Sequence, residues 1–128
     1  MKKRLFVSGS RVYDGGDTRM IRHELVALKD KVGVLVGDCY GVDLAVQQIC
    51  KEEGIECFVF HIGDRPRNNV GFKAYKVLGS RYVDKDVMMS KLCDGALVFW
   101  NGTSRGSKAN IDRIEAMGKP VKVVQALQ

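Results

Sequence analysis

The chain has 128 residues, of which 45% are hydrophobic and 28% charged, and its formal net charge is +6 at pH 7. This length fits one domain, residues 1–128, that buries a substantial core, and the composition excludes a disordered chain. Every apolar run is shorter than the roughly 20 residues of a membrane helix, and residues 5–7 are too few for a signal-peptide core. We therefore expect a cytoplasmic protein.

The cysteines and histidines indicate neither a metal site nor a disulfide framework. The four cysteines form no CxxC pair, and the chain has only two histidines. We expect no metal and no cofactor, and we expect Cys39, which lies in a loop, to be the exposed thiol. The basic residues are spread along the chain without a block of like charges, which makes nucleic acid the least favoured partner.

Apolar strands alternate with amphipathic helices along the sequence. Strands are predicted at residues 5–7, 32–36, 57–60, 96–100 and 121–124, and helices at residues 18–31, 42–53, 81–93 and in a last segment that packs through Ile111, Ile114 and Met117. Between residues 61 and 80, the spacing of Phe72, Tyr75 and Leu78 favours a short irregular helix.

This alternation predicts an α/β fold, a Rossmann-like doubly wound parallel sheet of about five strands with helices on both faces. We expect the strand order 3-2-1-4-5, in which residues 63–93 cross roughly 14 Å, three strand spacings, to reach the fourth strand. The order reverses between strands one and four. Ligands bind at such a point, so the crevice should lie between residues 8–11 and 101–107, flanked by residues 37–43.

Residues 101–107 combine glycines, hydroxyls and an arginine between a strand and a helix start. Free N–H groups and the positive end of the helix dipole favour an anion such as phosphate there. An ordinary polar loop has a similar composition. In the same way, Arg11 and Arg105 are either bidentate phosphate ligands or solvated charges.

Four motifs in this order resemble those of the SLOG superfamily, a Rossmann-like group that includes Lonely-Guy phosphoribohydrolases and the DNA-processing protein A family. They are Gly9-Ser10-Arg11, residues 37–43, residues 79–82 with 84–89, and residues 101–107. The likeness covers nearly the whole chain and is closest to small stand-alone members. It implies a site for a nucleotide or a nucleotide-derived ligand.

The crevice and the resemblance together predict a set of ligand-binding residues. They are Gly9, Ser10, Arg11, Asp38, Gly41, Asp43, Arg81, Asn101, Gly102, Thr103, Ser104, Arg105, Gly106 and Ser107. Asp43 either contacts a ribose hydroxyl or caps a helix, and Arg81 either contacts the ligand or pairs with Asp84. Tyr40 and Trp100 are candidates to stack on a base, although a tryptophan that ends a buried strand is more often core.

Lonely-Guy enzymes carry a glutamate that takes part in cleaving an N-glycosidic bond, and Asn110 stands at that position here. An amide cannot transfer a proton as a carboxylate does, so that activity is not carried over. We expect a sensor or carrier of a nucleotide-derived phosphate ligand. The alternative is a nucleotide N-glycosidase or ribosyl-transfer enzyme using Asp14, Asp84 or Asp86, because nucleoside deoxyribosyltransferases have a similar fold. Single-stranded DNA binding is a third hypothesis, and a homo-oligomer whose second subunit completes the site stays open.

Overall fold

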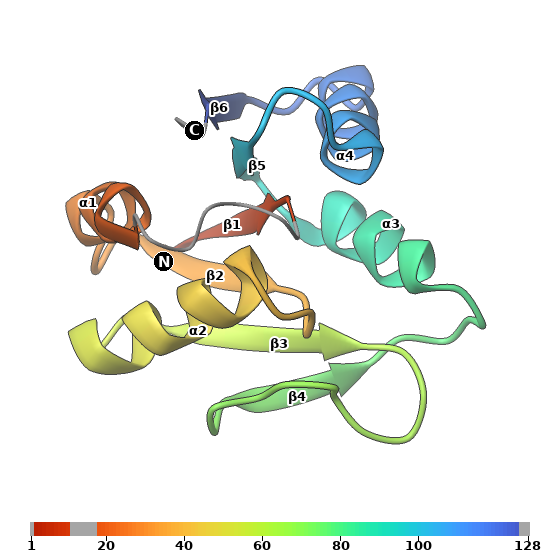
Figure 1. Cartoon of the computed structure of the whole chain (residues 1–128), viewed down its shortest axis with the longest axis horizontal. Helices are drawn as coiled ribbons and strands as arrows, with labels where there is room; N and C mark the ends of the chain where they lie inside the picture. The colour runs from red at the N-terminus through yellow and green to blue at the C-terminus, as the bar shows by residue number, and fades with distance from the viewer. Residues whose placement is uncertain (1, 11–17, 126–128) are drawn as a thin grey trace.

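The computed structural model describes residues 2–10 and 18–125, which form a parallel sheet with helices on both faces (Figure 1). The strands are β1 (Lys3–Gly9), β2 (Val32–Val36), β3 (Cys57–His61), β4 (Lys73–Lys76), β5 (Gly95–Trp100) and β6 (Val121–Gln125), and the helices are α1 (Thr18–Ala27), α2 (Val42–Glu53), α3 (Tyr82–Leu92) and α4 (Arg105–Ala116). Within the described ranges, no helix combines the length and apolarity needed to cross a membrane.

The sheet order is β4-β3-β2-β1-β5-β6, and all neighbouring strands are parallel. The five predicted strands correspond to β3-β2-β1-β5-β6, so the predicted fold class and strand order are confirmed, with one strand more than expected at the edge. The order reverses between β1 and β5, whose register pairs Phe6 with Ala96 and Gly9 with Phe99.

Two apolar layers cover the two faces of the sheet. Along β1, Val7 faces the layer formed with Ile21 and Leu25 of α1 and with residues of α2, while Phe6 faces the layer that contains Met89 of α3 and Ile114 of α4. All six of these side chains are fully buried. The two-residue period of a strand thus packs α1 and α2 on one face and α3 and α4 on the other (Figure 1).

The additional strand β4 replaces the short helix expected from Phe72, Tyr75 and Leu78. Tyr75 stacks on Phe60 of β3 at a ring-centroid distance of 5.4 Å, whereas Leu78 is 91% exposed. The three residues therefore do not share an apolar helical face. Pairing of β4 with β3, from Phe58 opposite Lys73 to His61 opposite Lys76, determines the local conformation instead.

The loop at residues 62–72 returns the chain from β3 to β4 alongside α2. The buried side chain of Gln47 in α2 donates to the Asn68 carbonyl (3.2 Å) and accepts from the Val70 N–H (3.1 Å). Lys51 Nζ of the same helix donates to the Val70 carbonyl at 2.7 Å. These contacts satisfy polar backbone groups of the loop and fix its path over the carboxyl end of β2.

All four cysteines are free thiols and all are buried. Cys39, expected to be exposed, is only 8% exposed, so that prediction was wrong. Its main-chain N–H donates to Asp43 Oδ2 at 3.2 Å, which folds the loop after β2 back onto the first turn of α2. Sequence position in a loop did not indicate this inward turn.

Candidate functional site

A cavity of about 380 Å³ opens at the carboxyl ends of β1 and β2. Its walls come from these strand ends, from the first turns of α2 and α3, and from α4 and the residue before it. This is the side of the molecule on which the strand order reverses, where open α/β sheets usually bind their ligands.

The loops after β1 and β5 meet beside this cavity. Ser10 N–H donates to the Phe99 carbonyl at 3.1 Å, and the Ser10 Oγ accepts from Asn101 N–H at 3.2 Å. Ser10 is 1% exposed, so its hydroxyl serves as a buried tie between the two loops. The two walls predicted from the sequence are therefore adjacent.

The loop before α4 is shaped by Asn101 and Ser104. Asn101 Oδ1 accepts hydrogen bonds from Thr103 N–H (3.0 Å) and Ser104 N–H (2.8 Å), and Ser104 Oγ caps the helix by accepting from Ser107 N–H (3.5 Å). Ser104, Gly106 and Ser107 line the cavity. The cavity therefore adjoins the amino end of a 12-residue helix, where the dipole is positive.

Ser8 of β1 also lines the cavity. It is 7% exposed, and its Oγ has no hydrogen-bond partner among the described residues. Buried hydroxyls normally have such a partner, and an unpaired one costs free energy.

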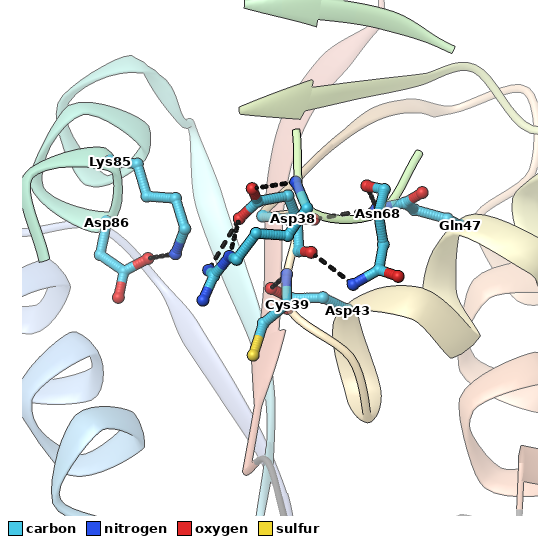
Figure 2. A network of polar contacts seen from close by, with 9 residues as sticks. Asp38, Cys39, Asp43, Gln47, Asn68, Lys85 and Asp86 are labelled. Carbon is cyan, nitrogen blue, oxygen red and sulfur yellow. Dashed lines mark hydrogen bonds and ion pairs between the residues drawn. The ribbon is translucent and has the colours of Figure 1, made fainter. Parts of the chain in front are cut away.

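Asp43 and Lys85 meet over Gly37, the residue that follows β2. A Cβ atom on Gly37 would lie 2.6 Å from Asp43 Oδ2 and 3.2 Å from Lys85 Nζ, so the glycine leaves room for both groups. Lys85 is 5% exposed and pairs with Asp86 Oδ1 at 3.2 Å (Figure 2). Burial raises the pKa of Asp43 to about 7, against the opposing field of Lys85.

Asp38 is fully buried and is held by Arg67 of the loop at residues 62–72. Arg67 donates to the carboxylate from its main chain (2.8 Å), from Nη2 (2.8 Å) and from Nε (3.2 Å). Burial opposes ionisation of Asp38, but the hydrogen bonds from Arg67 prevail and lower its pKa. The Arg67 guanidinium lies 3.9 Å from the centre of the Tyr82 ring, and both residues line the cavity.

Asn110 of α4 links this helix to α3 in the wall of the cavity. Its amide donates to Asp86 Oδ2 (3.4 Å) and accepts from Arg113 Nη1 (2.6 Å). Asn110 is 4% exposed, and all three residues line the cavity. Asn110, which the sequence resemblance places at the position of the Lonely-Guy glutamate, here contacts an arginine and an aspartate.

The structure brings some of the predicted ligand-binding residues to the cavity. Those in its wall are Gly9, Asp43, Ser104, Gly106 and Ser107, and those outside its wall are Ser10, Asp38, Gly41, Arg81, Asn101, Gly102, Thr103 and Arg105. Arg81 forms an exposed pair with Asp84 at 3.4 Å, and Arg105 is exposed. Trp100 donates from Nε1 to the Ser104 carbonyl at 3.0 Å and is not in the wall. Arg11 and Asp14 lie outside the described residues.

The cavity also contains functional groups outside the predicted ligand-binding set, chiefly Ser8, Arg67, Lys85 and Arg113, although Ser8 belongs to the predicted wall at residues 8–11. Ser8 carries a usable signal, since it is a hydroxyl in an otherwise apolar strand just before the first glycine turn. The other three are cations in a loop or in helices, and such residues are solvated by default. Within the described ranges, no group of three or more His, Cys, Asp or Glu side chains is placed to hold a metal ion.

No protein-family model matches the sequence, and no curated protein matches it. Among solved structures, the chain is similar to DNA processing protein A from Streptococcus pneumoniae, with a TM-score of 0.76 and 16% identity over 95% of this chain. It is equally similar in TM-score, 0.76, to the molybdenum cofactor carrier protein from Chlamydomonas reinhardtii, with 18% identity over 96% of this chain. The chain spans 50% of the first protein and 76% of the second. At this level of identity, the matches show that the chain shares the fold of these two proteins, in agreement with the predicted Rossmann-like fold.

Proposed function

We propose that the cavity binds a nucleotide or nucleotide-derived ligand through a phosphate group, and that the protein acts as a cytosolic sensor or carrier of this ligand. The observation that carries the proposal is the unpaired Ser8 hydroxyl in a wall that also contains the amino end of α4. A phosphate oxygen at this position completes the hydrogen bonding of Ser8 and lies in the positive field of the helix.

Two cations in the wall add to this support. Arg113 lies on α4 itself and donates to Asn110 of the same helix, and Lys85 is buried beside Asp86. Cations that line a phosphate-binding cavity form charge-assisted hydrogen bonds with the phosphate, and these are stronger than neutral hydrogen bonds. A second solved structure of the same fold belongs to a protein named as a cofactor carrier, which is in keeping with a small-molecule cargo.

The test is a ligand panel measured by thermal shift and calorimetry, with inorganic phosphate, AMP, ADP, NAD and ADP-ribose. A ligand at 100 times its Kd should stabilise the protein by about 2.7 kcal/mol. Arg113→Ala should weaken binding roughly 10-fold or more, the usual loss for a charge-assisted hydrogen bond. The proposal fails if none of the five compounds binds.

Two variants on α4 serve as controls for the position of the phosphate. Lys108 is exposed on the same helix, pairs with Asp112 at 2.6 Å and is not in the cavity wall, so Lys108→Ala should bind as the parent does. Arg105→Ala distinguishes the exposed loop from the cavity. If Arg105→Ala loses more affinity than Arg113→Ala, the phosphate lies on the loop at residues 101–105.

A second candidate function is cleavage of the N-glycosidic bond of a nucleotide. It is favoured by two carboxyl groups in one cavity, Asp43 with its raised pKa and Asp86 with its ammonium partner Lys85. Such a pair supplies an acid and a carboxylate to one reaction. Release of free base from nucleoside monophosphates, lost in Asp86→Asn but kept in Asp84→Asn outside the cavity, would support an enzyme.

Single-stranded DNA is the third candidate, since a structure of this fold belongs to a protein named for DNA processing. Binding to phosphate backbones falls steeply with salt concentration. An oligonucleotide titrated at low and high salt tests it, and tight, salt-sensitive binding that Arg113→Ala leaves intact would favour DNA over a ligand in the cavity.

A further inference from the structure

Two titratable side chains meet in the cavity wall at the end of β2. Asp43 comes from the first turn of α2, and Lys85 comes from the first turn of α3. Both lie close to Gly37, with Asp43 Oδ2 and Lys85 Nζ 2.6 Å and 3.2 Å from the position of a Cβ on that residue. The sequence predicts a ribose contact or a helix cap for Asp43, and neither role accounts for the nearby lysine.

The protein offers the carboxyl group of Asp43 little hydrogen bonding that would stabilise its charged form. Among the described residues, it accepts one hydrogen bond, from Cys39 N–H at 3.2 Å. The ammonium of Lys85 is already paired with Asp86 Oδ1 at 3.2 Å. A buried carboxylate with one neutral donor and a shared cation is poorly compensated, so the uncharged form of Asp43 is favoured.

The charged and titratable groups around Asp43 come from three further parts of the chain. They are Asp38 after β2, Lys85 and Asp86 of α3, and, paired with Asp38, Arg67 of the loop at residues 62–72. Arg67 forms an ion pair with Asp38. Lys85 forms one with Asp86 (Figure 2). Burial therefore dominates, helped by Asp86 and Asp38, and raises the pKa of Asp43 to about 7.

We propose that Asp43 enters the binding site as a neutral carboxylic acid, whose O–H group, beside the Lys85 ammonium, donates a hydrogen bond to an oxygen acceptor of the ligand. The ligand then binds together with one proton. This inference rests on the proposed function, because it concerns the same ligand in the same cavity.

The chemistry of the ligand gives the reason for this arrangement. An ionised Asp43 has no donor to offer and repels a phosphate oxygen, whereas the neutral acid donates to it. The acid and the ammonium then form a pair of donors in the wall of the cavity that the amino end of α4 also lines. An oxygen acceptor on the ligand, from a phosphate or a carbonyl group, satisfies both.

The experiment measures Kd by calorimetry from pH 7 to pH 9, with inorganic phosphate and ADP-ribose as probes. Each phosphate of ADP-ribose is a diester that carries one negative charge throughout this range, so ADP-ribose itself does not titrate. Inorganic phosphate still loses part of its second proton at the lower end of the range, and this contribution is the same for the parent and for Asp43→Asn. If only protein with a neutral Asp43 binds the ligand, the binding-competent fraction of the protein is one half at pH 7 and about 1% at pH 9. Kd should therefore rise about 50-fold between these pH values. Comparison of two buffers with different ionisation enthalpies should show uptake of protons by the parent protein at pH 8.

Asp43→Asn separates this proposal from other causes of pH dependence. The amide keeps the size and an N–H donor but cannot ionise, so its Kd should be nearly constant with pH and lower than that of the parent at pH 9. Asp112→Asn, which changes an exposed carboxylate on the outer side of α4, should follow the parent profile. Proton uptake is measured on the parent protein, so it tests whether the ligand binds together with a proton even if Asp43→Asn folds poorly.

The outcomes of these experiments test the role of Asp43 separately from the proposed ligand-binding function. Binding with constant Kd and no proton uptake, or the same pH profile in Asp43→Asn, overturns the role of Asp43 and leaves the proposed function standing. Failure of every probe to bind at pH 7 overturns the proposed function and this inference with it. Proton uptake with inorganic phosphate assigns the acceptor to a phosphate oxygen, and uptake with ADP-ribose alone assigns it to another part of the ligand.

Discussion

Arg67 holds Asp38 across 29 residues of sequence through one main-chain and two side-chain hydrogen bonds. The Cζ atom of the same guanidinium lies over the ring of Tyr82 at the start of α3, 3.9 Å from the ring centre. Asn68, the next residue, donates to the Asp38 carbonyl at 2.9 Å. The end of β2, the loop at residues 62–72 and the start of α3 are thus joined at one rim of the cavity.

Arg67→Met should destabilise the protein by about 3 kcal/mol, because it leaves the Asp38 carboxylate buried without its cation. Urea unfolding measures the free energy, and hydrogen exchange should become faster in residues 68–72. Lys76→Met is the matched control. Lys76 pairs with the fully exposed Asp64 at 3.6 Å, and loss of that pair should leave the unfolding curve unchanged. Equal effects of the two changes would contradict a structural role for the Arg67 pair.

Gly37→Ala should destabilise the protein by about 1–3 kcal/mol, because the added methyl group would overlap Asp43 Oδ2 and crowd Lys85 Nζ. Both side chains are buried and cannot easily move aside. Gly106→Ala is the control, since nothing lies within 4 Å of its Cβ position in the first turn of α4. It should stabilise the helix by about 0.5–1 kcal/mol. Thermal unfolding of both variants checks the two signs.

The fold was predictable because its signals are local. Five-residue apolar runs such as Val32–Val36 indicate strands buried on both faces, and the glycine turns after them mark the strand ends. β4 was missed because it has no such signal. All four of its residues are exposed, and the strand exists through pairing with β3 and the stacking of Tyr75 on Phe60.

The site was less predictable because burial of charge depends on tertiary packing. In the sequence, Lys85 is one charge among several on an amphipathic helix, yet the packing of α3 over the end of β2 leaves it 5% exposed. Arg67 follows a strand by six residues, and only the path of its loop along α2 carries it to Asp38. The sequence was enough to assign the loop glycines and hydroxyls to the site. It was not enough to assign the cations that lie beside them in the fold.

The pH dependence of stability offers a test of Asp43 that needs no ligand. Its pKa is about 7 in the folded protein and 3.8 as the ordinary value, so the folded state binds the extra proton between these pH values. A raised pKa gives stability that is complete below pH 3.8 and is lost as pH rises through 7. Relative to Asp43→Asn, the parent should lose on the order of 4 kcal/mol across that window, since each pH unit contributes about 1.4 kcal/mol.

Urea unfolding of the parent and Asp43→Asn at half-unit steps from pH 4 to pH 8 measures this difference. The gap between the two proteins should change in favour of the variant as pH rises and stop changing above about pH 8. Asp112→Asn should run parallel to the parent, because Asp112 is exposed. A gap that is constant with pH would mean that Asp43 titrates normally.

Ser8→Ala should separate stability from binding. The Ser8 hydroxyl is buried and, among the described residues, unpaired, so its removal relieves a desolvation cost and should leave the ligand-free protein as stable or up to about 1 kcal/mol more stable. Loss of its hydrogen bond to the ligand should weaken phosphate or nucleotide binding by about 5-fold to 10-fold.

Ser90→Ala, on the same side of the sheet, should have the opposite effects: a loss of stability and no loss of ligand affinity. Ser90 is also fully buried, but its Oγ donates to the Asp86 carbonyl at 2.7 Å, and it does not line the cavity. Its replacement should cost about 1 kcal/mol of stability and leave ligand affinity unchanged. Denaturation and calorimetry on the two variants give four values. A loss of stability in Ser8→Ala without a loss of affinity would show that its hydroxyl supports the fold rather than the ligand.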